Sequence, residues 1–464
     1  MHNSIRALAF AITLPVAIAV GCSPPRLDPP TSIGSEITAR TGATPAWTRG
    51  DSPTHPDADS LKGDSTTPLP TALDEATAVT MALDANPELA RMLAELDAMR
   101  AESLDAAAPQ NPVVNFASGV PLDSMGVVPI VAMLMVQIDD LWKQPIRSDA
   151  ARDTYEAALL ALGARAVGIA SEARTLWHEV AMRDIESSYA LNDLRQTEQL
   201  LSIARAKFAA GELAGDGVST AQAEFVDAHH RQEMAIEADE SARLELLALV
   251  GRAGAPTSWQ IGSPDPSTHI ALHGALMNDS DIADTLIASR LDVRAAEARA
   301  RAAAAALELA SRGRLKSVQL GGGFERDMEG DQAAAVTALV EVPLFNTGSA
   351  RIARAQAQLR AARIETERIR QSAVVAVRAA LVKARSAEDR HGITREHLVT
   401  ASEQSSARAE AAVAAGEGSQ ESAVNAAHDL NHAHLALIDL ERERRRARIA
   451  FTAAAGFLPS EVLP

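Results

Sequence analysis

The sequence predicts a mainly α-helical protein with a small β part, formed by duplication of one structural unit. Three observations support this: long proline-free stretches with heptad spacing, short strand-like runs that occur in pairs, and a nearly constant offset between similar segments. The chain of 464 residues is long enough for two or more ordinary domains. Apolar residues make up 47% but aromatic residues only 3%, so alanine, which favours helix, supplies much of the apolar share.

Similar segments recur along the chain at an almost fixed distance. The stretch "VEVPLFNTGSARIARAQAQL" begins at Val340, and a similar stretch, "VQIDDLWKQPIRSDAARDTYEA", begins at Val136, an offset of 340 − 136 = 204. Further on the offset is 417 − 212 = 205, because "AAGE" ends at both Glu417 and Glu212. A register held across most of both halves indicates an internal repeat. The predicted parts are a first repeat over 71–255, a linker over 256–280 and a second repeat over 281–464.

Two pairs of short segments read as β-hairpins, each around a polar loop, "PLDSMG" or "ERDMEGD". The apolar run from Ile130 to Ile138 is too short for a membrane helix but fits the roughly 9–11 residues of a tilted membrane strand. A soluble hairpin remains the alternative, because the alternation is poor. Four strands cannot close a barrel, so membrane strands here imply an oligomer. The predicted strands are 111–120, 128–138, 315–324 and 332–342.

The longest segments read as coiled-coil helices. From Ile352 onward, apolar or small residues recur at alternating steps of three and four, which is a heptad seam with many alanines. A helix over 351–415 would be about 98 Å long at 1.5 Å per residue, which is too long for a compact globule. The helices therefore form a rod or the staves of a tube. The predicted hairpins join 148–210 to 218–250 and 351–415 to 419–455.

The N-terminus reads as an export signal followed by a tether. Residues 1–21 contain Arg6 and then an apolar stretch too short to span a membrane. They end in "AVG" before Cys22, which is the only cysteine of the chain and resembles the acylated cysteine of a bacterial lipoprotein. Ordinary signal cleavage with an incidental cysteine is the alternative. The Pro/Ser/Thr-rich composition of residues 22–70 predicts a disordered tether.

Charge and motif content exclude several function classes. The formal net charge of −17 argues against a nucleic-acid partner. The sequence has no GxSxG motif and no P-loop, and no helix follows "GGGF" at 321–324, so we predict no enzyme and no cofactor. The glycines of that stretch are typical of a curved or crowded strand instead.

Three histidines of the segment "HDLNHAHLAL" are the candidate metal ligands. His428 and His432 have the i, i+4 spacing that places two ligands on one helix face, and His434 follows closely. The sequence offers no HExxH motif and no assured third ligand. We therefore predict a pair of helix-surface histidines and no metal site.

The duplicated order of helix, two strands and long helical hairpin resembles the TolC-type outer membrane efflux protein family. The resemblance covers residues 71–458. It is carried by "LDEATAVTMALDANPELARMLAELDAMRAE" at 73–102, by its echo "RLDVRAAEARARAA" at 290–303, and by the junction "VEVPLFNTGSARIARAQAQL". The segment "QIDDLWKQPIRSDAARD" is most similar to the heavy-metal efflux branch, although this first junction has Gln144-Pro145 where the second has a glycine.

The resemblance implies an architecture and a set of partners. Three chains would share one 12-strand β-barrel in the outer membrane, continued by an α-helical tunnel into the periplasm. The homotrimer would be a passive exit duct, working with a periplasmic adaptor and an inner-membrane pump and contacting outer membrane lipid. The alternative function is a non-spanning, lipid-anchored coiled-coil protein with a structural or adaptor role. The cargo, whether metal ions, drugs or other molecules, depends on the pump.

The same resemblance suggests site residues at the two ends of the tunnel. At the barrel–tunnel junction, Pro343 would end strand pairing and Gly348 would allow the turn into the helix. Trp142 and Phe345 would contribute to an aromatic girdle, with ordinary junction packing as the alternative. The junction set is Trp142, Arg147, Pro343, Phe345, Gly348 and Arg351.

The periplasmic tip would contact the adaptor and close the tunnel at rest. Family members often carry gate aspartates after the second turn, where this chain has Ser422 and Asn425, so an acidic gate is not expected there. Nearby carboxylates could form cation-attracting rings in a trimer, or could be solvated turn residues. The tip set is Gly211, Glu212, Asp216, Gly416, Glu417 and Glu421.

Overall fold

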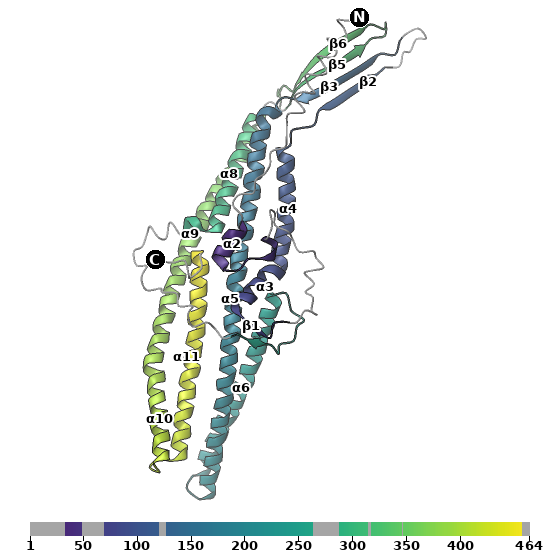
Figure 1. Cartoon of the computed structure of the whole chain (residues 1–464). Coiled ribbons are helices and arrows are strands. Elements are labelled where there is room, and N and C mark those ends of the chain that lie inside the picture. Colours follow the sequence, from purple (N-terminus) through teal and green to yellow (C-terminus); the bar gives the residue numbers. More distant parts are fainter. Residues whose placement is uncertain are drawn as a thin grey trace. The chain divides into compact units, whose positions relative to one another are not determined.

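The computed structural model describes residues 33–48, 69–119, 127–262, 287–313, 317–345 and 347–456 (Figure 1). The predicted signal segment and Cys22 lie outside these residues. The described chain divides into two compact units. Residues 94–161 and 292–369 form the unit that holds the main sheet, here called the strand unit. Residues 33–93, 162–291 and 370–456 form the other, here called the hairpin unit.

The strand unit contains the same succession of elements twice. In each repeat a helix leads into two antiparallel strands, and a long helix follows. The first succession is α4 (Pro87–Ala107), β2 (Val113–Ser118), β3 (Ile130–Gln137) and the start of α5 (Asp140–Ala209). The second is α8 (Leu291–Arg312), β5 (Val318–Arg326), β6 (Gln332–Val340) and the start of α9 (Ser349–Ile393). The predicted duplication and all four predicted strands are confirmed.

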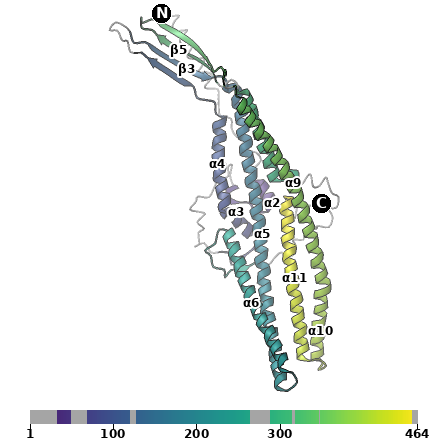
Figure 2. The same cartoon turned by 180° about the vertical axis from the view of Figure 1, so that it is seen from behind.

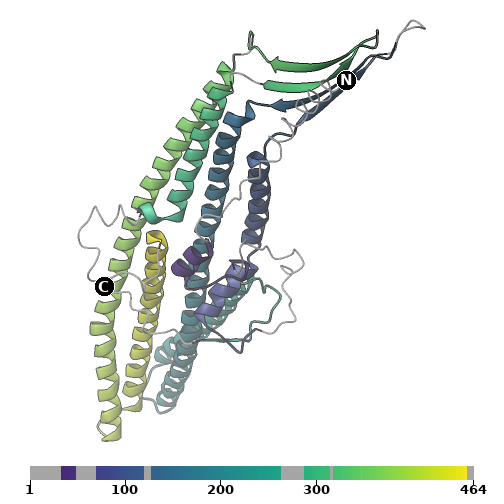
Figure 3. The ribbon, with the colours of Figure 1, turned by 45° about the horizontal axis from the view of Figure 1, so that its top comes forward.

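The four strands form one antiparallel sheet in the order β2-β3-β5-β6 (Figure 3). The two hairpins of the repeats join where β3 pairs with β5, with Ile130 opposite Arg326 and Gln137 opposite Gln319. Strands β2 and β6 are the edges, and among the described residues no strand pairs with the outer row of backbone N–H and C=O groups of either one. Both edges also expose large apolar side chains, namely Val113, Val114, Phe116, Val336, Leu339 and Val340.

The hairpin unit contains the distal parts of the long helices and the helices that return beside them (Figure 2). The distal part of α5 is followed by α6 (Gly215–Leu249). The distal part of α9 continues through a π-helical segment, η3 (Thr394–Val399), into α10 (Thr400–Ala414), and α11 (Gln420–Ala455) returns beside it. The predicted hairpins are confirmed, although α5 begins at Asp140 and contains Pro145. An ion pair of 2.8 Å between Asp140 and Arg147 spans that proline.

The π-helical segment η3 accounts for the change of offset between the repeats. The offset is 204 before it, at Arg351 and Arg147, and 205 after it, at Glu417 and Glu212. A single residue inserted into an α-helix is commonly absorbed as one π turn. The Thr400 N–H accordingly bonds to the carbonyl of Arg395, five residues earlier. Residues 190–195, the counterpart in the first repeat, are ordinary α-helix.

The start of the first repeat consists of two helices with a break between them. Helix α3 (Glu75–Ala85) ends before Asn86, and α4 begins at Pro87. The Asn86 side chain accepts hydrogen bonds from the N–H groups of Glu88 (2.9 Å) and Leu89 (3.3 Å). A capping asparagine followed by proline at the first helical position is a helix start, and this explains the break.

Two short strands link the start of the first repeat to the linker between repeats. Strand β1 (Ala72–Leu73) pairs in parallel with β4 (Gln260–Ile261). The Trp177 indole of α5 lies beneath this link, 1% exposed, and donates a hydrogen bond of 2.8 Å to the carbonyl of Leu73. The predicted linker over 256–280 is described only as far as residue 262.

The prediction of a disordered tether is wrong for residues 33–48. These residues form α2 (Ile33–Thr41) and a 3₁₀ turn, η1 (Ala46–Thr48), in the hairpin unit. Ile37 is fully buried, and the Trp47 indole donates to the carbonyl of Leu83 at 3.0 Å. Arg40 donates to the carbonyls of Ser289 and Gly456. Residues 22–70 are polar in overall composition, but residues 33–48 contain a few apolar side chains, and the burial of these side chains stabilises the segment.

An arginine-rich stretch of α11, "ERERRRAR" at 441–448, connects this helix to α5 and α9. We call its five arginines, Arg442, Arg444, Arg445, Arg446 and Arg448, the arginine belt. Toward α5, Arg442 pairs with Glu186 and Arg446 with Glu179. Toward α9, Arg444 and Arg448 both pair with Glu388, at 3.2 and 2.6 Å. Within α11, Arg444 and Arg445 hold Glu441, whose carboxylate also lies 3.1 Å from Nε2 of His391.

The arginine belt predicts a pH-dependent contribution to stability. Burial alone would raise the pKa of Glu441, but Arg444 and Arg445 outweigh it and hold that pKa below its usual value. A carboxyl whose folded-state pKa is lowered stabilises the protein above its unfolded pKa, near 4.3, and this contribution is lost as the pH falls further. At pH 7 we expect Glu441→Gln to lower the free energy of unfolding by about 1–3 kcal/mol.

The measurement is the thermal unfolding midpoint of wild type and variant between pH 7 and pH 3.5. The gap between the two is expected to narrow below about pH 4.3. Both proteins also lose stability below about pH 6.5 because burial lowers the pKa of His391. Glu441 opposes that lowering, so this loss is larger in the variant and the informative change in the gap is the one below about pH 4.3. Glu443→Gln is the control, since Glu443 forms an exposed pair with Arg390 and should matter little. A gap that stays constant down to pH 3.5 would contradict the prediction.

None of the helices in the described part of the chain combines the length and the apolar character that crossing a membrane requires.

Candidate functional site

Two equivalent arginines hold the junctions between helices and strands in the strand unit. Arg147, near the start of α5, donates hydrogen bonds to the carbonyls of Ala106 (2.8 Å) and Ala108 (3.0 Å) at the end of α4. Arg351, near the start of α9, donates to the carbonyl of Gly313 at the end of α8. The final carbonyls of a helix have no partner within the helix, and the helix dipole also favours a cation at that end. Each long helix therefore caps the helix that precedes its hairpin.

The other junction residues occupy different environments. Trp142 is half-buried, whereas the Phe345 side chain is 101% exposed. Pro343 lies in the segment between β6 and α9, after strand pairing has ended. Gly348 has a φ of 77°, a left-handed backbone conformation that favours glycine. A Cβ at this position would also lie 3.1 Å from the guanidinium of Arg351.

The two hairpin turns of the hairpin unit share one backbone motif. Gly211 and Gly416 have φ values of 75° and 76°, as predicted for turn glycines. The next residue in each turn, Glu212 or Glu417, donates its N–H back to the carbonyl five residues earlier, that of Lys207 or Ala412. This is a Schellman-type helix ending, which needs a left-handed residue at the glycine position.

The predicted tip carboxylates do not form one cluster in the chain. Glu212, Asp216 and Glu417 are exposed. Glu421 is half-buried, and it forms an ion pair with Lys207 that connects the end of α5 to the start of α11. Its charge is therefore compensated within the chain.

The two gate-equivalent residues, Ser422 and Asn425, are exposed on α11. The Ser422 N–H donates to Oγ of Ser419, which caps the helix. The structure thus places Ser422 in a helix cap.

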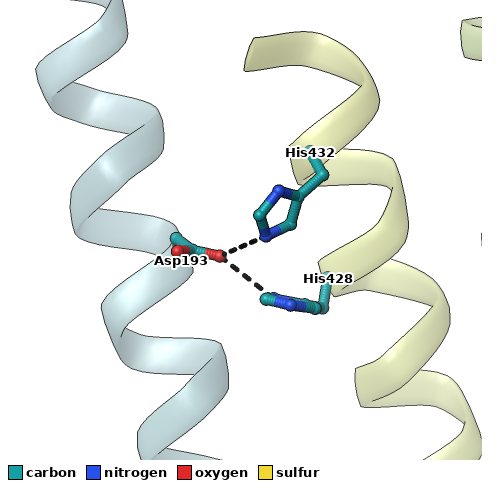
Figure 4. Close-up of side chains that lie close together, drawn as sticks. All are labelled: Asp193, His428 and His432. Carbon is teal, nitrogen blue, oxygen red and sulfur yellow. Dashed lines mark ion pairs between the residues drawn. The ribbon is translucent and has the colours of Figure 1, made fainter. Parts of the chain in front are cut away.

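The candidate histidines meet a buried carboxylate that sequence reasoning missed. Asp193 of α5 is fully buried, and its Oδ1 lies 3.0 Å from Nδ1 of His428 and 3.2 Å from Nε2 of His432, both on α11. Figure 4 shows both imidazole rings beside this oxygen. The other carboxylate oxygen, Oδ2, accepts hydrogen bonds of 2.7 and 3.2 Å from Arg231 of α6. His434 lies apart from this group, with its ring 5.3 Å from that of Tyr189.

The charges around Asp193 favour its ionised form. Burial alone would raise the pKa of Asp193, but His428 and Arg231 lower it to about 2. Burial lowers the pKa of His432, and the nearby Asp193 opposes this only in part. Asp193 is more than 230 residues from the histidines in sequence and lies in no motif, so only the packing of α5 against α11 reveals the group.

Comparisons with known proteins give a family match for the second repeat and a shared fold for the chain. Residues 282–457 match the model of a family described as outer membrane efflux protein. A comparison of the sequence with curated proteins finds no match.

Three similar solved structures illustrate the fold. One is a membrane protein from Pseudomonas aeruginosa, with 22% identity over 82% of this chain and 93% of that one and a TM-score of 0.66. The outer membrane protein VceC of Vibrio cholerae has 18% identity over 82% and 96%, with a TM-score of 0.65. The outer membrane channel CmeC of Campylobacter jejuni has 14% identity over 95% and 96%, with a TM-score of 0.63.

Proposed function

We propose that this protein, whose second repeat belongs to the outer membrane efflux protein family, is the passive exit duct of a tripartite efflux system, acting as a homotrimer. One observation carries the proposal: the chain has the fold of solved outer membrane channels and a four-stranded sheet whose two apolar edges pair with no other strand in the described part of the chain. A sheet with such edges is incomplete as a soluble structure, because exposed apolar edge strands invite pairing with another chain.

A trimer would satisfy both edges. Strand β6 of one copy would pair with β2 of the next, and three sheets of four strands would close a barrel of twelve. The exposed side chains of Val114, Phe116 and Val336 would then face lipid. The half-buried Trp142 and the exposed Phe345 would lie near the periplasmic membrane surface, where aromatic side chains concentrate.

The hairpin tips are the proposed contact for the periplasmic adaptor, which connects the duct to an inner-membrane pump. Their exposed residues include Gly211, Glu212, Asp216 and Gly416, and Glu417 adds a third exposed carboxylate. We propose that the ion pair of Lys207 with Glu421 holds α5 to α11 in the resting tip. Acylation of Cys22 would add a lipid anchor in the outer membrane.

The proposed cargo class follows from the similarity of the first junction to the heavy-metal branch. A duct makes few specific contacts with what passes through it, so the test must compare cargo classes. In a strain that lacks this gene, intracellular zinc, cobalt, cadmium and copper are expected to rise while a lipophilic dye does not. A rise in dye alone would replace the heavy-metal proposal by a drug-type one.

The duct itself is tested by conductance across planar lipid bilayers. Purified full-length protein and its Cys22→Ser variant are both expected to insert and to conduct, because the strands, and not the lipid, cross the membrane. Carbonate extraction should also leave Cys22→Ser in the membrane fraction of cells. If that variant becomes soluble and neither protein conducts, the chain is a lipid-anchored, non-spanning protein and the duct is disproved.

A further inference from the structure

We propose that Asp193, His428 and His432 form a binding site for a divalent transition-metal ion of the zinc class, which joins α5 to α11. The three residues come from helices of different repeats, so a bound ion would link the first hairpin to the second. The site is independent of conduction, since it lies within one chain and requires neither a trimer nor a membrane.

The spacing of the donor atoms fits such an ion. The carboxylate Oδ1 of Asp193 is 3.0 Å from Nδ1 of His428 and 3.2 Å from Nε2 of His432, and all three atoms lie within 4.8 Å of one another. Tetrahedral zinc with bonds of about 2.0–2.2 Å holds its ligand atoms roughly 3.3–3.6 Å apart. The two oxygen–nitrogen distances are a few tenths of an ångström shorter than this spacing, so small side-chain movements would bring them to it.

Two of these atoms have unused bonding capacity. Oδ1 of Asp193 and Nδ1 of His428 are buried, and neither makes a hydrogen bond of acceptable geometry to another described residue, although they are close. Buried polar atoms without hydrogen bonds are uncommon and costly in folded proteins. An ion between them would satisfy both, because carboxylate oxygen and neutral imidazole nitrogen are ordinary zinc ligands.

The residues around the group orient the Asp193 carboxylate and leave a path by which an ion can enter from solvent. Arg231 holds the other oxygen of Asp193, Oδ2, through two hydrogen bonds, which fixes the carboxylate with Oδ1 toward the histidines. Partners of this kind orient the ligands in metal sites. The His432 side chain is 46% exposed, which leaves a path for the ion and room for a water as fourth ligand. The Arg231 charge opposes a cation, so we expect a site weaker than closed structural zinc sites.

A second group of potential ligands, Asp327, Glu329 and Asp331, carries no such inference. These residues are exposed, and Asp327 Oδ1 already accepts hydrogen bonds from the N–H groups of Glu329 and Asp331 within the loop between β5 and β6. The group also lacks a nitrogen ligand, which zinc favours.

The test is a calorimetric titration of Zn²⁺ into the metal-stripped full-length protein in detergent. A Cys22→Ser background removes the only thiol of the chain. We expect a binding step of one ion per chain whose affinity falls about 100-fold or more in the double variant His428→Gln, His432→Gln, since loss of an outer-sphere partner alone costs 10–100-fold. The matched control is His229→Gln, His434→Gln, which also removes two histidines but leaves the group intact.

Hydrogen exchange provides a readout that identifies the link. Zn²⁺ should slow amide exchange on both α5 near Asp193 and α11 near His428 in the background protein and in the control, but not in the double variant. Helical circular dichroism must be the same for all three proteins. The proposal is overturned if the background protein binds no Zn²⁺, or if the double variant binds it with unchanged affinity. Bilayer conductance of the double variant should remain normal, so failure of this site is distinguishable from failure of the duct.

Discussion

Replacement of Trp177 by alanine is expected to lower the free energy of unfolding by about 3–5 kcal/mol. The indole is 1% exposed and is among the largest fully buried side chains among the described residues. Its removal leaves a cavity in the hairpin unit, and it also leaves the carbonyl of the fully buried Leu73 without the indole N–H. Because Leu73 belongs to β1, the pairing of β1 with β4 should weaken as well.

The measurement is the midpoint of chemical denaturation of the detergent-solubilised protein, monitored by the circular dichroism of its helices. Trp177→Phe keeps most of the ring volume and loses the hydrogen bond, so a smaller cost, starting at about 1 kcal/mol, is expected. Phe208→Ala is the control, because Phe208 is 53% exposed near the tip of α5. Equal denaturation midpoints for Trp177→Ala and Phe208→Ala would show that the indole does not support this core.

Replacement of Gly323 by alanine is expected to prevent formation of the native sheet. Gly323 of β5 lies opposite Met133 of β3. A Cβ at this position would overlap the carbonyl oxygen of Ala132 and would lie 2.8 Å from Cα of Met133. Both are backbone atoms held in the ladder, so the clash cannot be relieved by a side-chain rotation. The cost should exceed the about 1–3 kcal/mol of ordinary overpacking.

The amount of folded, protease-resistant protein in cell membranes measures this effect. We expect Gly323→Ala to be strongly depleted and degraded relative to wild type. Gly392→Ala in α9 is the matched control, because a Cβ there meets no atom within 4 Å and alanine favours helix. Wild-type amounts of Gly323→Ala in the membrane would mean that β3 and β5 are not packed as closely as described.

Features with a local or periodic signal were predictable from the sequence. The turn glycines Gly211 and Gly416 and the crowded glycines of "GGGF" were recognised because tight turns and close strand contacts select glycine. The four strands and the helical hairpins followed from apolar runs, heptad spacing and the repeat offset.

Features that depend on long-range packing were not predictable. The repeat offset pairs Arg147 with Arg351, but only the structure shows that both bind carbonyls at the end of the preceding helix. Asp193 has no motif around it and gains its importance from α6 and α11. The order of residues 33–48 was not predictable because the composition of the whole tether is polar. The burial of Ile37 and Trp47 depends on packing against residues far away in the sequence.

The π-helical segment η3 has a consequence for how the two repeats can diverge. Each residue added to a plain α-helix turns everything beyond it by about 100°, which would move a heptad seam off its neighbour. The wide turn at Thr394–Val399 takes up the one additional residue, so we expect the seam beyond it, where α10 packs against α11, to keep the phase of its counterpart in the first repeat. Single-codon insertions and deletions in these long helices should therefore survive selection near this turn, and should be eliminated elsewhere along the seam.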